Sequence, residues 1–474
     1  MLTDFLPKIG FLALALTSSA LSCSDLQHPV EPSGPIGTQV WITNPGKTAL
    51  LWKTNAETVS DLSGLPIITV DPATRFQSVT GFGYTLTGGS AQLLYQMDPE
   101  PRRKMLEELF GTGDPSIRVS YLRISLGASD LSESVFTYND LPNGQTDESL
   151  QQFSLSKDTL ALIPLLKEIR AINPSIPIMA SPWTAPVWMK SNQQSVGGYL
   201  LPQYYPVYAQ YFVKYLQAMQ AAGIPVQAVT PQNEPNHGGN NPSMVMTATQ
   251  QADFIKNHLG PAFQAAGLPV KIVIWDHNCD QPEFPLQILA DPQAKSFVEG
   301  SAFHLYAGDI SALSQVHQAH PDKKVYFTEQ WTSSTGDFGQ DLQWHVKNVM
   351  IGSMRNWSTV ALEWNLANDP QFKPHTPGGC SQCKGALTIQ GNEVERNVSY
   401  YIIAQFSKFI PPGSTRIASN LITQLPNVAF ETPEGKIVLV VLNESSKTEK
   451  FSVQLPDKTI GTALSPGSVG AFVF

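Results

Sequence analysis

Cysteine is scarce in this chain, with four in 474 residues. A secreted protein this poor in cysteine is held by its hydrophobic core and not by cross-links. A zinc site would need a second CxxC pair, and Cys380 and Cys383 in CSQC form the only one. That pair is interpreted as a local disulfide or as free thiols with Cys279 nearby. We therefore expect no metal and no cofactor.

Lysine and arginine are also in the minority, 30 against 39 aspartates and glutamates, which gives a net charge of −9. Nucleic-acid phosphates bind to a basic face, and without a block rich in Lys or Arg we expect no nucleic-acid partner. The Gly-rich segment GFGYTLTGGSA, residues 81–91, lacks the Lys-Ser/Thr ending of a phosphate loop. It is interpreted as a tight entry to a barrel.

Long hydrophobic runs are missing as well. The apolar stretch near the N-terminus, within FLPKIGFLALALTSSALSC, is too short to span a bilayer comfortably, so residues 1–23 are predicted to be a secretory signal. ALSC resembles a bacterial lipoprotein box, in which Cys23 becomes the acylated first residue. The polar, Pro-containing residues 24–36 fit a tether. We expect an exported lipoprotein of the outer surface or periplasm; an ordinary cleaved signal is the alternative.

What the chain does contain is an alternation of short apolar runs with segments of helical period. The runs predicted as strands are residues 79–84, 121–126, 176–181, 226–231, 271–276, 302–306, 324–328 and 359–364. Between them, residues 158–172 carry apolar side chains at Leu160, Ile163, Leu166 and Ile169, a helical spacing. Near-continuous apolar strands are typical of parallel strands buried on both faces. Eight such units predict an α/β fold, a (β/α)8 TIM barrel over residues 76–412.

The two ends of the chain have a different pattern. Residues 37–75 and 413–474 alternate apolar and polar side chains between turns, as in GTQVWITNPGKTALLWKT and IVLVVLNES. This pattern predicts antiparallel strands. Because both ends carry them, we expect the N- and C-terminal strands to join into one β-sandwich fused to the barrel.

Catalytic residues of a TIM barrel lie where the strands end at their C-terminal side. Polar, charged and aromatic residues stand at seven of the eight predicted ends: Arg123, Trp183, Asn233 and Glu234, Asp276 and His277, His304 and Tyr306, Glu329 and Trp331, and Glu363, Trp364 and Asn365. Pro235 disfavours the α region for Glu234, so we expect an extended backbone there.

Glu234 and Glu329 both follow apolar strands and are predicted to face each other. Two such carboxylates can hydrolyse a glycosidic bond, one donating a proton to the leaving oxygen and the other attacking the anomeric carbon. The acid needs a raised pKa, to which its neighbour's negative charge contributes. Tryptophans fit this interpretation, because sugar rings stack on aromatic planes.

Seven segments together resemble glycoside hydrolase family 30, the glucosylceramidase and β-1,6-glucanase family, over about residues 65–474. They are GFGYTLTGGSA, YLRISLGASDLS, ASPWTAPVWMKSN, TPQNEPN, FHLYAGD, YFTEQW and FSKFIPPGSTRI. The resemblance implies a (β/α)8 barrel with a β-sandwich and retention of anomeric configuration. The chain departs from the human lysosomal enzyme at GGCSQCKGALTI, which leaves the aglycone side open.

The resemblance also implies roles for particular residues. Glu234 matches the acid/base and Glu329 the nucleophile. The residues that match the glucose subsite are Asp130, Trp183, Asn233 and Trp364, and those that match positions behind it are Arg123, His304 and Tyr306. His304 by itself would be a hydrogen-bonded core histidine; Trp188 and Trp331 could simply pack.

We predict a retaining β-glycosidase that acts on β-linked glucose, with β-1,6-glucan or its oligosaccharides as substrate. Glucosylceramide is the alternative substrate, and a non-catalytic glycan-binding surface lipoprotein is the alternative from another class. The loops expected at the barrel mouth are mainly polar, which suits a second sugar ring better than a ceramide. We expect a monomer, and leave endo or exo action open.

Overall fold

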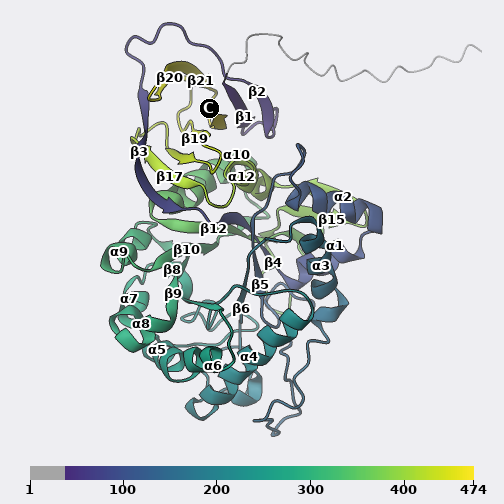
Figure 1. Ribbon diagram of the computed structural model, residues 1–474. Coiled ribbons are helices and arrows are strands. Elements are labelled where there is room, and N and C mark those ends of the chain that lie inside the picture. Colours follow the sequence, from purple (N-terminus) through teal and green to yellow (C-terminus); the bar gives the residue numbers. More distant parts are fainter. Residues whose placement is uncertain (1–37) are drawn as a thin grey trace, which may run out of the picture. The chain divides into compact units, whose positions relative to one another are not determined.

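The computed structural model describes residues 38–474, so the predicted signal, the tether and Cys23 lie outside the described residues. The core of the described chain is a closed barrel (Figure 1). Its strands are β4 (Gly81–Leu86), β5 (Tyr121–Ser125), β6 (Ile178–Ser181), β7 (Ala228–Val229), β8 (Lys271–Cys279), β9 (Val298–Gly308), β10 (Lys324–Glu329) and β12 (Ser358–Asn365). All neighbouring pairs are parallel. The predicted (β/α)8 barrel is confirmed.

Helices surround the barrel strands. They are α1 (Gly88–Gln96), α2 (Pro99–Phe110), α3 (Leu162–Ile172), α4 (Tyr205–Ala221), α5 (Ala248–Phe254), α6 (Gly260–Ala265), α7 (Glu283–Ala290), α8 (Pro292–Phe297), α9 (Ala312–Ala319), α10 (Phe338–Trp344), α11 (Gly352–Arg355) and α12 (Val398–Ser407). Among residues 38–474, none has both the length and the apolar character needed to cross a membrane.

Three of the four apolar positions predicted for one helical face are buried in α3. Ile163, Leu166 and Ile169 are buried on one face, as their spacing predicts. Leu160 is not part of that face, because it lies in a short 3-10 turn before the helix and is 72% exposed. The helical period therefore began one turn later than predicted.

The inside of the barrel is filled by side chains that point inward from the strands. One buried cluster takes residues from seven strands: Tyr121, Met179, Ala228, Val273, Ala302, Tyr326, Val360 and Leu362. Gly83 lets β4 approach the backbone of its neighbour β5, because a Cβ added there would lie 2.0 Å from the carbonyl oxygen of Tyr121. The Gly-rich segment 81–91 is thus a barrel strand followed by the start of α1, as interpreted from the sequence.

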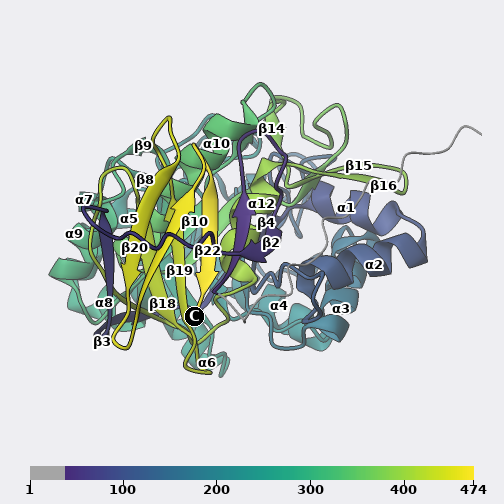
Figure 2. The ribbon, with the colours of Figure 1, turned by 90° about the horizontal axis from the view of Figure 1, so that it is seen from above.

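Strands from both chain ends form the β-sandwich, as predicted (Figure 2). They are β1 (Gln39–Thr43), β2 (Trp52–Asn55), β3 (Ile67–Ser78), β17 (Thr415–Ser419), β18 (Asn427–Glu431), β19 (Ile437–Leu442), β20 (Glu449–Gln454), β21 (Thr459–Leu464) and β22 (Val469–Val473). β1 pairs with β22, and the long β3 pairs with β20 near its start and with β17 further along. β3 therefore passes between the two sheets, which enclose a core that includes Ile68 and Phe451.

A half-buried guanidinium joins the barrel to the sandwich. Arg355, at the end of α11, donates through Nε to the carbonyl oxygen of Asn427 at 2.5 Å. Its Nη2 donates to the carbonyl oxygen of Ser419 at 3.0 Å and to the Asn427 side chain at 3.1 Å. Because these acceptors lie in or beside β17 and β18, the last barrel helices are held to the sandwich by polar contacts as well as by packing.

Candidate active site

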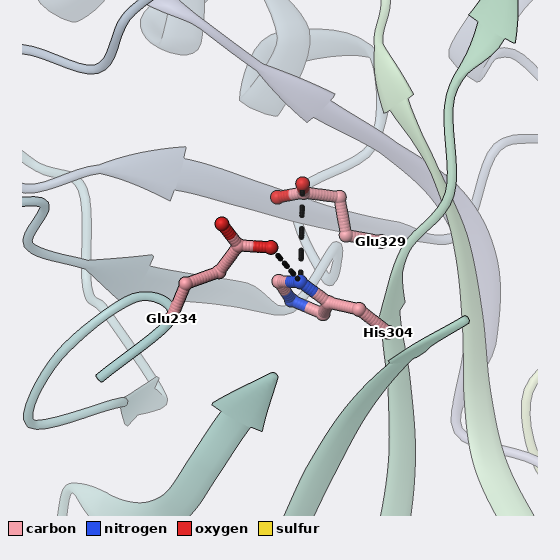
Figure 3. A group of neighbouring side chains, drawn as sticks. All are labelled: Glu234, His304 and Glu329. Carbon is pink, nitrogen blue, oxygen red and sulfur yellow. Dashed lines mark hydrogen bonds and ion pairs between the residues drawn. The ribbon is translucent and has the colours of Figure 1, made fainter. Parts of the chain in front are cut away.

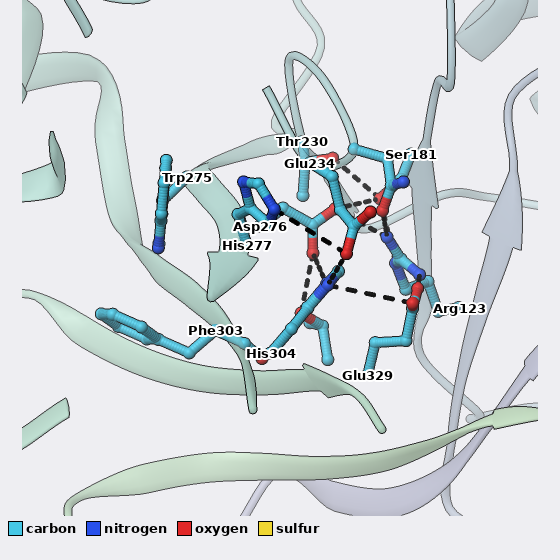
Figure 4. A network of polar contacts seen from close by, with 12 residues as sticks. Arg123, Ser181, Thr230, Glu234, Trp275, Asp276, His277, Phe303, His304 and Glu329 are labelled. Atoms are coloured by element: carbon cyan, nitrogen blue, oxygen red, sulfur yellow. Dashed lines mark hydrogen bonds and ion pairs between the residues drawn. The ribbon is translucent and has the colours of Figure 1, made fainter. Parts of the chain in front are cut away.

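Most of the polar residues predicted at the strand ends, among them Arg123, Glu234, Asp276, His304 and Glu329, converge at one mouth of the barrel (Figure 4). Arg123, from β5, is fully buried among them. Its Nη1 donates to Oε2 of Glu329 at 2.6 Å, and its Nη2 donates to Asn233 Oδ1 at 2.6 Å and to Asp276 Oδ2 at 2.8 Å. The guanidinium also lies over the Trp183 ring, with its carbon 5.0 Å from the ring centre. Arg123 thus fixes side chains from three other strand ends.

Glu234 and Glu329 face each other across His304 (Figure 3). One oxygen of each carboxylate and one His304 ring nitrogen all lie within 4.8 Å of one another. His304 Nδ1 is 3.1 Å from Glu234 Oε1 and 3.9 Å from Glu329 Oε1. The Tyr306 hydroxyl donates to the second glutamate, Glu329, at 3.0 Å. The sequence prediction that these four side chains share one site agrees with this geometry.

The backbone of Glu234 is not extended, and that expectation was wrong. Glu234 has a φ of 45°, in the left-handed region, as have Trp275 at 73° and Asp276 at 62°. Pro235 does keep Glu234 out of the right-handed α region, but a tight turn then selects positive φ: the carbonyl of Glu234 accepts from the amide of His237 at 2.8 Å. Such conformations cost about 1–3 kcal/mol each and gather at functional sites.

Asp276 is the centre of the polar network below the two glutamates, and the sequence marked it only as a strand-end residue. It is fully buried. Its oxygens accept from Arg123 at 2.8 Å, His304 at 3.2 Å, Thr328 at 2.7 Å, Ser181 at 3.0 Å and Thr230 at 2.9 Å. Burial would raise the pKa of this carboxyl, but the Arg123 charge and the hydrogen bond from His304 lower it well below its ordinary value.

His304 carries the proton of this group at neutral pH. Burial opposes the charge, but the negative Glu329 and the hydrogen bonds to Asp276 and Glu234 raise the pKa of His304 to about 9. A positively charged imidazole therefore lies against Glu234.

The two glutamates respond differently to this charge. Burial raises the pKa of both, yet for Glu234 the hydrogen bond and the charge of His304 outweigh it, so the pKa of Glu234 is lowered. For Glu329 burial prevails over the charges of His304 and Arg123, and its pKa is raised. The expectation of a raised pKa at Glu234 was thus wrong for the resting protein, because the cationic His304, with Nδ1 3.1 Å from Glu234 Oε1, outweighs the effect of burial.

Above the glutamates opens a cavity of about 300 Å³. Its lining comprises Asp130, Trp183, Glu234, His237, Asn240, His277, Asn278, Tyr306, Glu329, Trp331, Trp364, Cys380 and Cys383. Burial and the charges of Glu329 and Glu234 raise the pKa of Asp130 to about 7. Three of the residues predicted to bind the sugar, Asp130, Trp183 and Trp364, thus lie in the wall of this cavity.

Other predicted residues lie below or outside the cavity. Asn233 does not line it and binds Arg123 instead. Glu363 points to the helix layer, where it meets His345 Nδ1 at 2.8 Å. Trp188 packs away from the mouth and donates through Nε1 to Asn139 at 3.0 Å. These side chains support the barrel rather than the cavity.

Cys380 and Cys383 form a disulfide in the cavity wall, whereas Cys279 is a free, buried thiol. Of the two interpretations left open by the sequence, the local disulfide is the one found. The position of this pair and the lining residues His237 and Asn240 could not be predicted, because they follow the strands in segments without a periodic pattern. Asn278 was missed because β8 extends to Cys279, beyond the predicted strand of residues 271–276.

By distance alone, Glu234, His304 and Glu329 could hold a metal ion. Metal binding requires a neutral imidazole. With a pKa of about 9, His304 is protonated at neutral pH, and the Arg123 charge already lies on Glu329. The chemistry of this donor set therefore favours a proton and not a cation.

Two protein-family models match this chain. The model of the Glycosyl hydrolase family 30 TIM-barrel domain matches residues 79–410, and that of the family 30 beta sandwich domain matches residues 413–472. The chain belongs to glycosyl hydrolase family 30. It is therefore a glycoside hydrolase, and the resemblance inferred from the sequence is confirmed.

Family 30 relatives of two kinds are similar to this chain. It is 31% identical to the endo-1,6-beta-D-glucanase BGN16.3 of Trichoderma harzianum, over 97% of this chain and 99% of that one. It is 30% identical to the lysosomal acid glucosylceramidase of Mus musculus, over 98% and 93%. The solved structure of the endo-beta1,6-glucanase BT3312 matches with a TM-score of 0.85 and 35% identity, covering 92% of this chain and 99% of that one.

Proposed function

We propose that this family 30 protein is a retaining β-glycosidase in which Glu329 is the nucleophile and Glu234 the acid/base. The observation that carries the proposal is that oxygens of the two carboxylates lie within 4.8 Å of each other and of His304. Retaining enzymes hold their carboxyl groups about 5–5.5 Å apart, whereas inverting enzymes hold them about 6.5–9.5 Å apart to admit water. The short spacing suits direct attack on the sugar.

The contacts of each glutamate support the division of roles. Arg123 and Tyr306 donate to the two oxygens of Glu329, which orients that carboxylate for attack, and the Arg123 charge opposes the burial that raises its pKa. Glu234 has His304 beside it, and the pair holds one proton. A proton shared in this way is available at the Glu234 carboxyl for the leaving oxygen.

The reaction then has two steps. In the first, a Glu329 oxygen bonds to the anomeric carbon, the glycosidic C–O bond breaks, and the leaving oxygen takes the proton from Glu234. In the second, Glu234 takes a proton from water, the water oxygen attacks the anomeric carbon, and Glu329 leaves as a carboxylate. The proton given up in the first step comes from His304 through Nδ1 to Glu234, so the pair holds no proton in the glycosyl-enzyme and Glu234 is free to act as a base. The proton that Glu234 takes from water in the second step passes back to His304, which the restored negative charge of Glu329 stabilises.

For the sugar we propose β-linked glucose held by Asp130, Trp183 and Trp364. Trp183 and Trp364 lie side by side, with ring centres 5.5 Å apart, and give an aromatic wall. Asp130 lines the same cavity with a carboxyl that can bond to sugar hydroxyls. A volume of about 300 Å³ is at the lower end for ligand sites, which suits one or two sugar rings.

We propose β-1,6-glucan or its oligosaccharides as the substrate. His237, Asn240 and Asn278 make the cavity wall near Glu234 polar, as a second sugar ring requires. Relatives named endo-1,6-beta-D-glucanase align along almost the whole chain, which supports this choice. Glucosylceramide is the second candidate, because relatives named glucosylceramidase align equally far.

The test is reducing-sugar release from linear β-1,6-glucan, run beside ceramide release from glucosylceramide in detergent. We expect release from the glucan with little ceramide. Ceramide formation without attack on the glucan would make glucosylceramide the preferred substrate. If neither substrate nor an aryl β-glucoside is hydrolysed, the proposal is refuted.

We also propose that the mature protein is an exported, lipid-anchored monomer that begins at Cys23. The supporting features are the apolar signal, the small residues before Cys23 and the polar residues 24–36. Wild-type protein should fractionate with membranes and Cys23→Ser should be released from them. A wild-type protein that is already in the aqueous fraction and has another N-terminus would contradict the lipid anchor. The expected monomer is tested separately, by light scattering of the Cys23→Ser protein without detergent.

A further inference from the structure

The segment of residues 376–384, here termed the cysteine loop, closes one wall of the cavity. It follows the last barrel strand and contains the Cys380–Cys383 disulfide. Two of its amides bind Asp130: the Cys380 amide donates to the Asp130 carboxylate at 3.2 Å, and the Thr376 amide donates to the Asp130 carbonyl at 2.8 Å. The loop therefore holds both the backbone and the side chain of Asp130.

The other cysteine of the loop packs into the aromatic wall. Cys383 is 4% exposed and belongs to a buried cluster with Leu131, Trp183 and Trp364. Trp331, two residues after Glu329, packs against the same cluster. The disulfide thus links the residue whose amide binds Asp130 to the residue that contacts the tryptophans.

A purely stabilising role explains this disulfide poorly. The stabilisation that a cross-link gives through the unfolded chain grows with the length of the loop it closes. Cys380 and Cys383 are separated by only three positions, so their bond removes little freedom from the unfolded chain. The position of the disulfide in the cavity wall indicates a role at the cavity.

We propose that the Cys380–Cys383 disulfide is a positioning element of the sugar site, which keeps the Cys380 amide on Asp130 and the loop against Trp183 and Trp364. The inference rests on the proposed role of these three residues in binding glucose. Breaking the bond should weaken sugar binding while the chemistry at Glu234 and Glu329 continues, because neither glutamate contacts the loop through a hydrogen bond among the described residues.

The bond can be broken without mutation. A dithiol such as dithiothreitol gives two electrons and two protons: the S–S bond becomes two thiols, and the reagent closes to a cyclic disulfide. Attack is possible at Cys380, which is partly exposed, while Cys383 is buried. Loss of the Cys380 amide also removes a contact that opposes the raised pKa of Asp130, so a larger fraction of that carboxyl would be neutral near pH 7.

The experiment measures the affinity of the full chain for 1-deoxynojirimycin, a glucose-shaped probe, by tryptophan fluorescence. It compares oxidised protein, dithiothreitol-treated protein, Cys380→Ser/Cys383→Ser and Cys380→Ala/Cys383→Ala. A hydrogen bond to a charged group corresponds to a factor of about ten in affinity, so Kd should rise about tenfold on reduction and in both double variants. KM for an aryl β-glucoside should rise similarly, with kcat changed less.

Two comparisons separate positioning from general loosening. Dithiothreitol should have no further effect on the double variants, and Cys279→Ala should respond to it as wild type does. In Asp130→Asn, reduction should change Kd by a smaller factor than in wild type, because the two changes act on one contact. Circular dichroism and thermal midpoints of each protein identify any variant that has failed to fold.

The results distinguish this inference from the proposed function. If the oxidised protein neither binds the probe nor cleaves the glucoside, the proposed function fails, and the inference with it. The second case is an oxidised protein that both binds the probe and cleaves the glucoside. If Kd and KM then stay unchanged after reduction confirmed by thiol titration, or in the folded double variants, the disulfide only stabilises the fold and the inference alone is refuted.

Discussion

Replacement of Asp276 by asparagine is the sharpest test of the polar network. Asp276 accepts from five side chains, three at Oδ2, including Arg123, and two at Oδ1, including His304. Asparagine keeps one acceptor oxygen and turns the other side into a donor. Arginine cannot accept a hydrogen bond, so the oxygen must stay toward Arg123 and the new NH2 group must face His304.

Two consequences follow for Asp276→Asn. The Arg123 charge loses one of its two buried carboxylate partners, and breaking a buried pair costs about 3–5 kcal/mol of folding stability. His304 must give up its Nε2 proton to accept from the NH2 group, so its pKa falls. The proton shared with Glu234 is then lost at a lower pH than in wild type, and the alkaline limb of kcat/KM should move to lower pH.

Urea denaturation and a pH profile of kcat/KM on an aryl β-glucoside measure both effects. Asp322→Asn is the matched control, because Asp322 also pairs with a cation, Lys295 at 2.9 Å, but its side chain is 57% exposed. The control should change stability little and leave the pH profile unaltered. If Asp276→Asn behaves like the control, the network does not hold His304 in its charged form and the reasoning is wrong.

Three further predictions concern the two glutamates, the proton on His304 and the buried Lys190. Glu329→Gln should remove nearly all turnover, whereas Glu234→Gln should lower kcat/KM by about 10²–10⁴-fold for poor leaving groups and far less for dinitrophenyl glucosides; equal losses on both substrates would contradict these roles. Since the pKa of His304 is about 9, above the 6.5 of a free imidazole, its proton is present below that pH, and wild-type kcat/KM should fall as pH rises through about 9; a profile flat to pH 10 would refute this. Lys190 donates to three carbonyl oxygens, those of Gln194, Ser195 and Ser243. Lys190→Met should therefore cost about 3 kcal/mol, against little change for the exposed Lys104→Met, as measured by urea denaturation.

Much of the fold could be predicted because the barrel strands are local, apolar and bounded by turns. Each predicted run coincides with an observed strand, although β7 shrinks to Ala228–Val229 and β9 extends to Val298–Gly308. Strand ends follow from the same runs, which is why the sequence predicts that Glu234 and Glu329 face each other. The sequence carries this information because a strand buried on both faces is a short continuous apolar run with polar residues at its ends.

What could not be predicted depends on contacts between distant residues. The φ of Glu234 follows from the tight turn that ends at His237, and the Pro235 rule excluded one region without selecting the other. The place of Cys380 beside Asp130 joins residues 250 positions apart. The pKa of Glu234 depends on which strand end brings His304 against it, and no local pattern contains that order.

The pairing of β1 with β22 has a consequence for how the chain completes its folding. β22 lies between β1 and β19, and Gln39 stands opposite Val473. The first strand of the sandwich therefore gains this neighbour only after residues 469–473 have been synthesised, whereas the barrel can close once residue 365 has been made. A chain that ended before Val469 would carry two open strand edges, on β1 and on β19, and open edges pair with other chains. Loss of β22 should thus appear as aggregation during synthesis and not as a slower enzyme.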